Sequence, residues 1–191
     1  MPLISITPRA LQPITLAEAK LHLRVDTGSD DTLINVLIIA ATDAAEHLMG
    51  RAVLPQTWQL TLDSFEANEI TLQKPPISAI TSVKYLQSSD GVLTTLSPGA
   101  YVLATANDYT ARLVPAYGTN WPASRRMPEA VRIVFVTGYA DATSVPELIK
   151  AWIKLRLAAL YENRQAWTEG KAIEQNPFVD RLLDRYTAIT C

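Results

Sequence analysis

Apolar residues at helical spacing dominate the first fifty positions. Thr15 and Glu18 have the spacing of a capping box, in which the hydroxyl accepts from a helical N–H and the carboxylate reaches back to the first residue. The apolar residues that follow share one face, which predicts a short helix to about Val25. An acidic turn, DTGSDD, then precedes a second predicted helix, Asp31–Met49, which Gly50 stops.

The first half of the second predicted helix, LINVLIIAA, is apolar nearly all round, and Asn35 is its one polar position. A helix with this pattern lies at the centre of a bundle or is shared with another subunit. Exposing such a helix to water costs about 25 cal/mol for each Å² of apolar surface. We therefore expect another part of the fold, or a partner, to cover it.

From residue 57 the apolar period changes to two. Trp58, Leu60 and Leu62 alternate with polar residues, which predicts a half-buried strand. Pro75 and Pro76 mark a boundary or a sheet edge, because proline cannot donate to a β-ladder. Further strands are predicted at residues 70–72, 82–87, 92–96, 101–103, 112–114 and 131–136, with the turn SSDG joining 82–87 to 92–96.

Helical spacing returns after Gly138. Ser144 and Glu147 have the spacing of a second capping box, which predicts a helix to about Asn163. A last helix is predicted from Pro177 to about Tyr186. The longer helix has two apolar stripes, one with Leu148, Trp152, Leu155 and Ala159, the other with Ile149, Ile153, Leu157 and Leu160.

This order of elements predicts an α+β fold. We expect a helical bundle, with two N-terminal and two C-terminal helices, that carries an inserted antiparallel β module. The helical core is placed at residues 1–55 and 140–191, and the β module at 56–139. A chain of 191 residues is long enough for such a bundle with its inserted module.

Composition excludes several classes of protein. The net charge of −2 disfavours a protein whose main task is to grip nucleic acid by its phosphates, although DNA that slides past is compatible with it. Cys191 is the single cysteine, so no internal disulfide is expected and the chain is typical of a reducing compartment. Neither a signal peptide nor an uninterrupted apolar run of about 18 residues is found, so no membrane segment is expected.

Motifs for catalysis or metal binding fail on inspection. Asp26 opens the triplet DTG of aspartic proteases, whose chemistry needs two such aspartates, but here the triplet separates two helices and suits a turn with a helix cap. As a calcium loop the same segment has Asp31 where glycine is needed and Leu37 where glutamate is needed. His22 and His47 have no partner at ligand spacing. We expect no catalytic, cofactor-binding or metal-binding residues, and no enzyme.

Several segments in fixed order resemble a known family. They are ITLAEAKLHLRVD, DDTLINVLIIAATDAAEHLMGRAVLPQTWQLTLDSF, KPPISAITSVKYL, RLVPAYGTNWP and VRIVFVTGYADATSVPELIKAWIKLRLAALYENR. Together they are similar to the longer members of the head–tail connector family of tailed bacteriophages, also called adaptor or head-completion proteins. The similarity extends over roughly residues 12–187 and is carried by the series, since each piece alone is weak.

The resemblance implies a structural protein of the virion neck, made in the cytoplasm of the host bacterium. Family members form a dodecameric ring under the portal protein, let DNA pass through the lumen without reading its sequence, and receive the next neck or stopper protein. They carry a β module inserted in the helical core, need no cofactor, and engage the portal through their C-terminal segment. The expected portal-contact residues are Phe178, Arg181, Leu182, Arg185 and Tyr186, and the expected ring-interface residues are Leu33, Val36, Leu37 and Ile39.

Two other interpretations stay open at this point. One is a different neck or tail-completion protein, such as a stopper or tail terminator, although those are dominated by β-structure. The other is a small cytosolic hydrolase that uses Asp26.

Overall fold

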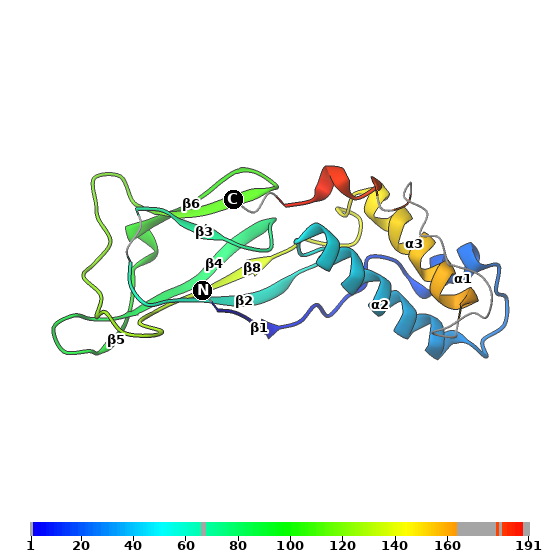
Figure 1. Ribbon diagram of the computed structural model, residues 1–191, viewed down its shortest axis with the longest axis horizontal. Helices are drawn as coiled ribbons and strands as arrows, with labels where there is room; N and C mark the ends of the chain where they lie inside the picture. Colours follow the sequence, from blue (N-terminus) through cyan, green and yellow to red (C-terminus); the bar gives the residue numbers. More distant parts are fainter. Residues whose placement is uncertain (1, 66–67, 164–178, 180, 189–191) are drawn as a thin grey trace, which may run out of the picture.

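The computed structural model describes residues 2–65, 68–163, 179 and 181–188. The molecule is elongated, with the β-strands at one end and the α-helices at the other (Figure 1). Within the described residues the fold is α+β with antiparallel sheets, so the predicted class is confirmed at this level.

The helical end contains α1 (Leu16–Leu23), α2 (Asp31–Met49) and α3 (Glu147–Glu162). The predicted capping box at the start of α1 is confirmed, because the Thr15 hydroxyl accepts from the Glu18 N–H and the Glu18 carboxylate accepts from the Thr15 N–H at 2.7 Å. Hydrogen bonds to the ionised carboxylate from the Thr15 N–H and then from the Thr15 hydroxyl lower the pKa of Glu18. The chain leaves α2 at Gly50 in the left-handed conformation, with φ 65°.

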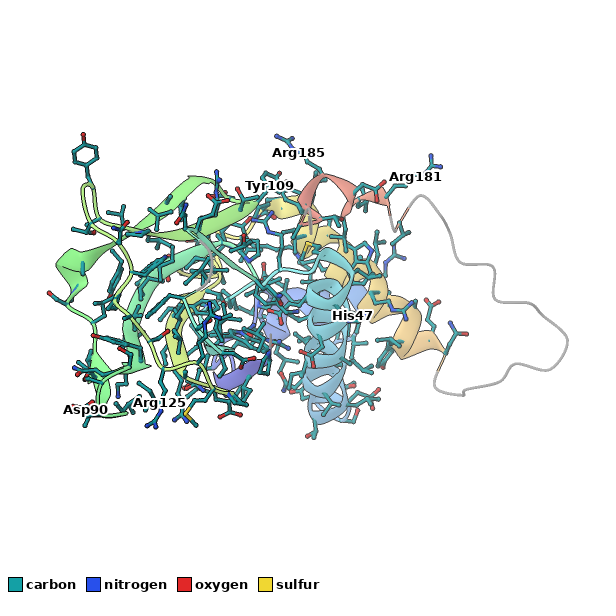
Figure 2. All side chains as sticks on the ribbon, turned by 60° about the vertical axis from the view of Figure 1, so that its left-hand side comes forward. His47, Asp90, Tyr109, Arg125, Arg181 and Arg185 are labelled. Atoms are coloured by element: carbon teal, nitrogen blue, oxygen red, sulfur yellow. The ribbon has the colours of Figure 1, made fainter. Side chains whose placement is uncertain are left out.

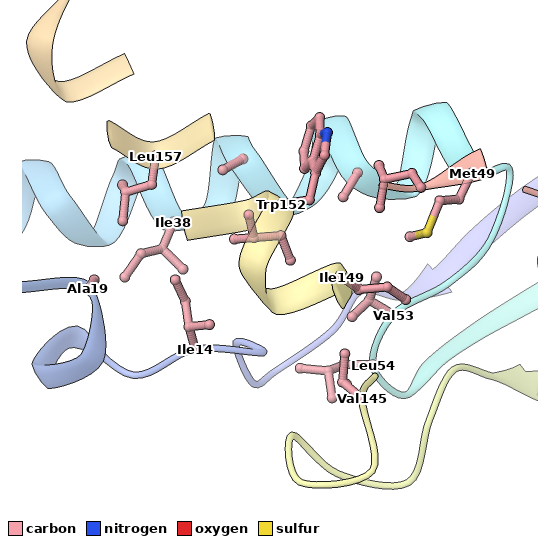
Figure 3. Packing of buried hydrophobic residues seen from close by; sticks show 14 of the residues in the cluster. Ile14, Ala19, Ile38, Met49, Val53, Leu54, Val145, Ile149, Trp152 and Leu157 are labelled. Carbon is pink, nitrogen blue, oxygen red and sulfur yellow. The ribbon is translucent and has the colours of Figure 1, made fainter. Parts of the chain in front are cut away.

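Buried apolar side chains join these helices into one core (Figure 3). Ile38 of α2 lies between Ile14, which precedes α1, and Leu157 of α3. Trp152 is 1% exposed, so its indole belongs to the core and is not available to a partner. The helical end therefore has its own interior, separate from that of the strands.

The larger sheet has five antiparallel strands in the order β1-β2-β8-β4-β5. Its strands are β1 (Leu3–Thr7), β2 (Gln56–Leu62), β8 (Val131–Thr137), β4 (Ile77–Leu86) and β5 (Leu93–Thr95). The central strand β8 is paired on both sides and buries alternate residues, as its apolar sequence predicted.

A second sheet covers one face of the first. It has the order β3-β7-β6 and is formed by β3 (Ile70–Leu72), β7 (Thr110–Pro115) and β6 (Tyr101–Asn107), the last preceded by the 3₁₀ turn Pro98–Ala100. Side chains from the two sheets share one apolar interior, which includes Leu60, Leu113, Ile133 and Phe135. The predicted hairpin of β4 and β5 is confirmed, with Leu86 opposite Leu93.

Glu46 connects the helical end to the strands. Its carboxylate Oε1 accepts from the Val53 N–H at 2.8 Å and from Gln56 Nε2 at 2.6 Å. On the other side of the junction, Gly138 has φ 96°, and a Cβ there would collide with the carbonyl of Leu54. Two of the chain crossings between the ends, from α2 to β2 and from β8 to α3, are thus held by a carboxylate and by a position that requires glycine.

Strand β1 was not predicted. Its sequence, LISIT, is short, and its last four residues are exposed. Its partner lies far along the chain, since Leu3 pairs with Leu60. A local pattern cannot reveal such a pairing, because the register is set by the distant strand.

The second predicted capping box is wrong. Helix α3 begins after Pro146, with no side-chain cap. Ser144 instead donates from its N–H and its hydroxyl to Asp141 Oδ1, at 2.8 and 2.9 Å. The carboxylate of Asp141 is the stronger acceptor and fixes the preceding turn, so Ser144 does not reach the helix.

The predicted C-terminal helix ends at Tyr186 as expected, but its last turn, Asp184–Tyr186, is a 3₁₀ helix and not an α-helix. In the first part of the predicted helix, residues 177, 178 and 180 lie outside the described residues. Two C-terminal α-helices are therefore not confirmed. After this turn the Ala188 N–H donates to the Met49 carbonyl at 2.7 Å, which places the segment across the end of α2.

Candidate assembly surfaces

Helix α2 has one buried side and one open side. Ile34, Ile38 and Ala45 lie in the core, whereas Val36 and Ile39 are 56% and 44% exposed. The sequence suggested a helix apolar all round, and the fold covers only one half of it. The open half is an apolar surface without a cover among the described residues.

The expected ring-interface residues divide between these sides. Val36 and Ile39 lie on the open side of α2. Leu33 is half-buried, and Leu37 is half-buried and packs against the helical core. Val36 and Ile39 are therefore the two that a neighbouring molecule can reach most easily.

Among the described residues, α2 is also the one helix long and apolar enough to cross a membrane by length and composition. Its best window has a mean hydropathy of 1.3, and 33% of that window is buried inside the protein. Core helices of proteins in water reach the same values, so composition alone is weak support for a membrane span.

The linker between β1 and α1 is tied to α2 by Arg9. The guanidinium Nη1 lies 2.7 Å from Asp43 Oδ1 and 3.2 Å from Glu46 Oε2, and Nη2 donates to the carbonyl of Ile39 at 3.2 Å. Arg9 and Glu46 have side chains that are 8% and 13% exposed. The linker is thereby fixed along α2 beside the open side.

The C-terminal segment packs on its own core. Leu183 is 2% exposed, and Val179, Leu182 and Tyr186 pack partly against the helices. Arg181 and Arg185 instead project from this segment into solvent (Figure 2). Of the expected portal-contact residues, Arg181 and Arg185 are thus exposed to solvent, whereas Leu182 and Tyr186 pack against the helical core. Phe178 lies outside the described residues.

Arg51 binds the C-terminal segment, and this role of Arg51 was not predicted from the sequence. The residue is 1% exposed, and its guanidinium donates to the carbonyls of Asp108 at 2.7 Å and Tyr186 at 3.3 Å. The same group lies over the ring of Tyr109 at 4.8 Å and donates to Tyr139 Oη at 3.2 Å. No signal in the sequence brings these distant residues together.

Burial at this cluster raises the pKa of Tyr139, which keeps its hydroxyl protonated as a partner for Arg51. Arg51, just after the end of α2, therefore binds three parts of the chain through neutral acceptors and aromatic rings: the turn between β6 and β7, Tyr139 after β8, and the C-terminal segment.

Asp26, His22 and His47 were considered for catalysis or metal binding, and all three lie at exposed positions. Asp26 is exposed in the loop between α1 and α2, at the edge of an open depression lined by Lys20, Leu21 and Arg24. His22 and His47 are exposed on α1 and α2. In the described ranges, no group of three or more His, Cys, Asp or Glu side chains could hold a metal ion.

Comparison with known proteins finds that part of the chain matches a family model. Residues 13–86 match the family model described as phage gp6-like head-tail connector protein. Over these residues the chain is similar to phage gp6-like head–tail connector proteins. The resemblance stated from the sequence is confirmed, and the matched family and solved structures are structural proteins of phage or phage-like particles, as predicted, and not enzymes.

Solved structures extend the similarity to the whole chain. It is similar to a chain in the virion of a native gene transfer agent particle, with TM-score 0.80 and 25% identity, covering 100% of this chain and 97% of that chain. A chain in the neck of an empty gene transfer agent particle, computed with C6 symmetry, has TM-score 0.80 and 23% identity at the same coverage. A third, from the native neck computed with C12 symmetry, has TM-score 0.78 and 22% identity, again covering 100% and 97%.

The two neck structures under 25% identity show that this chain shares their fold. No curated protein matches the chain. The α+β architecture, including the strands at the far end, is therefore that of proteins found in particle necks.

Proposed function

We propose that this connector is a ring-forming subunit of a virion neck. Copies assemble side by side beneath the portal protein, extend the DNA exit channel, and offer their far surface to the next neck, stopper or tail protein. The family match and the whole-chain similarity to proteins of particle necks support this role. The C6 and C12 symmetries of the similar neck structures support a ring, for which twelve copies is our proposal.

The observation that carries the proposal is the open apolar side of α2. Val36 and Ile39 are large apolar side chains exposed on a helix that is otherwise the centre of the core. Neighbouring copies in a ring would remove this surface from water, which is a favourable change of about 25 cal/mol for each Å². A freely diffusing monomer would leave it exposed.

Charge supports a passive channel. The net charge of −2 gives no general attraction for DNA phosphates, so DNA can move through the lumen without being held. The proposed location is the virion, after synthesis in the cytoplasm of the host. Residues 1–55 and 140–191 are proposed as the connector core, and 56–139 as the inserted β module.

The C-terminal segment is the proposed portal contact. Arg181 and Arg185 are exposed on it and suit acidic groups of a portal, whereas Leu182 and Tyr186 face the connector's own core. Phe178 remains part of this proposal.

Co-sedimentation with purified cognate portal tests the function. The full chain is expected to sediment with the portal, and Arg181→Glu with Arg185→Glu to stay behind while its thermal melting is unchanged. Lys84→Glu, an exposed charge on β4, is the matched control and should still co-sediment. If the full chain fails to sediment with the portal, the proposed function is wrong. Retained binding by the arginine variant would reject the portal contact alone.

A further inference from the structure

Helix α3 has an open apolar stripe of its own. Leu148 and Leu155, two helical turns apart, are 43% and 39% exposed. They alternate along the helix with the small residues Ala151 and Ala158, which are half-buried. The buried residues of α3, among them Ile153 and Leu157, lie on the other side of the helix. The stripe thus alternates large and small apolar side chains, a surface that can interlock with another helix.

The open stripes of α2 and α3 point away from each other. The two helices pack together through their buried sides, with Ile38 near Leu157 in the core (Figure 3). Val36 lies on the side of α2 opposite that contact, and Leu155 on the corresponding side of α3. The helical core therefore has two apolar surfaces, one on each flank.

A closed ring of many copies needs two different surfaces on each subunit. In cyclic assemblies above the dimer, the contact is heterologous, so one surface of a copy binds the other surface of the next copy. A single self-complementary surface gives only pairs. This requirement follows from the ring of the proposed function, on which the present inference rests.

Asp43 beside the α2 stripe and Arg156 beside the α3 stripe carry opposite charges. Asp43 lies one turn beyond Ile39 on α2, and its side chain is 62% exposed even though it also pairs with Arg9. Arg156 is exposed beside Leu155 and makes no ion pair or hydrogen bond with another described residue. The attraction between Asp43 of one copy and Arg156 of the next favours head-to-tail contact over contact between two like flanks.

We infer that the occupant of the α3 stripe is a second copy of this chain: the open side of α2, with Val36 and Ile39, packs on Leu148 and Leu155 of the neighbour, and Asp43 lies near Arg156. Repetition of this contact closes the ring.

Blocking one flank at a time tests this arrangement. Val36→Glu blocks the α2 side and Leu155→Glu blocks the α3 side, and both substitutions are at exposed positions, so circular dichroism and melting should match those of the unmodified chain. Analytical ultracentrifugation is run well above the concentration at which the unmodified ring appears, with portal added if it is needed for assembly. Leu21→Glu, at a position 82% exposed on α1, is the control and should still form rings.

Each blocked variant alone is expected to be monomeric. An equal mixture of the two should give heterodimers and nothing larger, because the free α2 side of one variant meets the free α3 side of the other. Rings from Leu155→Glu, dimers of Leu155→Glu alone, or a mixture that stays monomeric would each overturn the inference while leaving the ring itself in place. Absence of rings from the unmodified chain, with and without portal, would overturn the proposed function and this inference together.

Discussion

Arg9 and Glu46 form an ion pair, with Nη1 and Oε2 3.2 Å apart, that fastens the N-terminal linker to α2. The other carboxylate oxygen of Glu46 accepts from Val53 and Gln56, at the point where the chain enters β2. One carboxylate thus connects the linker, the helical core and the larger sheet. Both side chains of the pair are largely buried, so the loss of either leaves unpaired polar groups.

Glu46→Ala is predicted to lower the free energy of unfolding by about 3 kcal/mol, because it removes one anionic partner of the buried Arg9 guanidinium and leaves the Val53 N–H and Gln56 Nε2 without their acceptor. Asp43→Ala is the matched control, since Asp43 also bonds Arg9 but is 62% exposed, and it should cost less than about 1 kcal/mol. Urea unfolding of both variants measures this difference. Equal losses would show that Glu46 does not have the connecting role described.

Trp152→Ala is predicted to destabilise the protein by about 3–5 kcal/mol, because it leaves a large cavity in the helical core. Trp152→Phe should cost much less, since Nε1 has no hydrogen-bond partner in the described part of the chain and the aromatic ring is kept. Thermal unfolding followed by calorimetry compares the two. A loss below about 1 kcal/mol for the alanine variant would contradict a core position.

Local signals were enough to predict α1 and α2. The Thr15 capping box and the Gly50 stop depend on neighbouring residues, so the sequence contains the whole interaction. The strands β2 to β8 were also predicted near their positions, because alternation along a strand is local.

The predictions that failed concern features that depend on contacts between residues far apart along the chain. The stripe with Leu148 and Leu155 was expected to share one face with Trp152, but α2 covers Trp152 and leaves the leucines open. The pairing of β1 and the position of Arg51 likewise depend on residues far along the chain. These features define the candidate assembly surfaces. The resemblance to the family was therefore easier to predict from the sequence than the surfaces proposed for assembly.

Arg51→Ala is predicted to release the C-terminal segment. The carbonyl of Tyr186 loses its donor and the rings of Tyr109 and Tyr139 lose the cation packed beside them, at a cost of about 2–4 kcal/mol. Trypsin should then cleave faster after Arg185.

The matched control is Arg112→Ala, which removes an exposed arginine from an ion pair with Glu69 and should leave this cleavage rate unchanged. Unchanged cleavage in Arg51→Ala would mean that the segment is held without Arg51.

Asp141 is predicted to titrate at an unusually low pH. Hydrogen bonds from Thr143 and Ser144 stabilise its ionised form and lower its pKa from 3.8 to about 2. Because the folded pKa lies below the unfolded one, this carboxylate contributes stability above about pH 4 and loses it as the pH falls toward 2.

Carbon-13 NMR of the carboxyl group measures the midpoint of this titration directly. In Thr143→Val with Ser144→Ala, the midpoint should rise toward 3.8, since the donating hydroxyls are gone. A midpoint near 3.8 in the unmodified chain would contradict the hydrogen bonds at this turn.

Cryo-electron microscopy of the chain bound to its cognate portal tests the central claim most directly. Averages made without imposed symmetry are predicted to show a closed ring of this chain below the portal, coaxial with the channel, with the helical cores in contact around the ring. An empty portal exit, or single copies bound without contact to one another, would contradict the account.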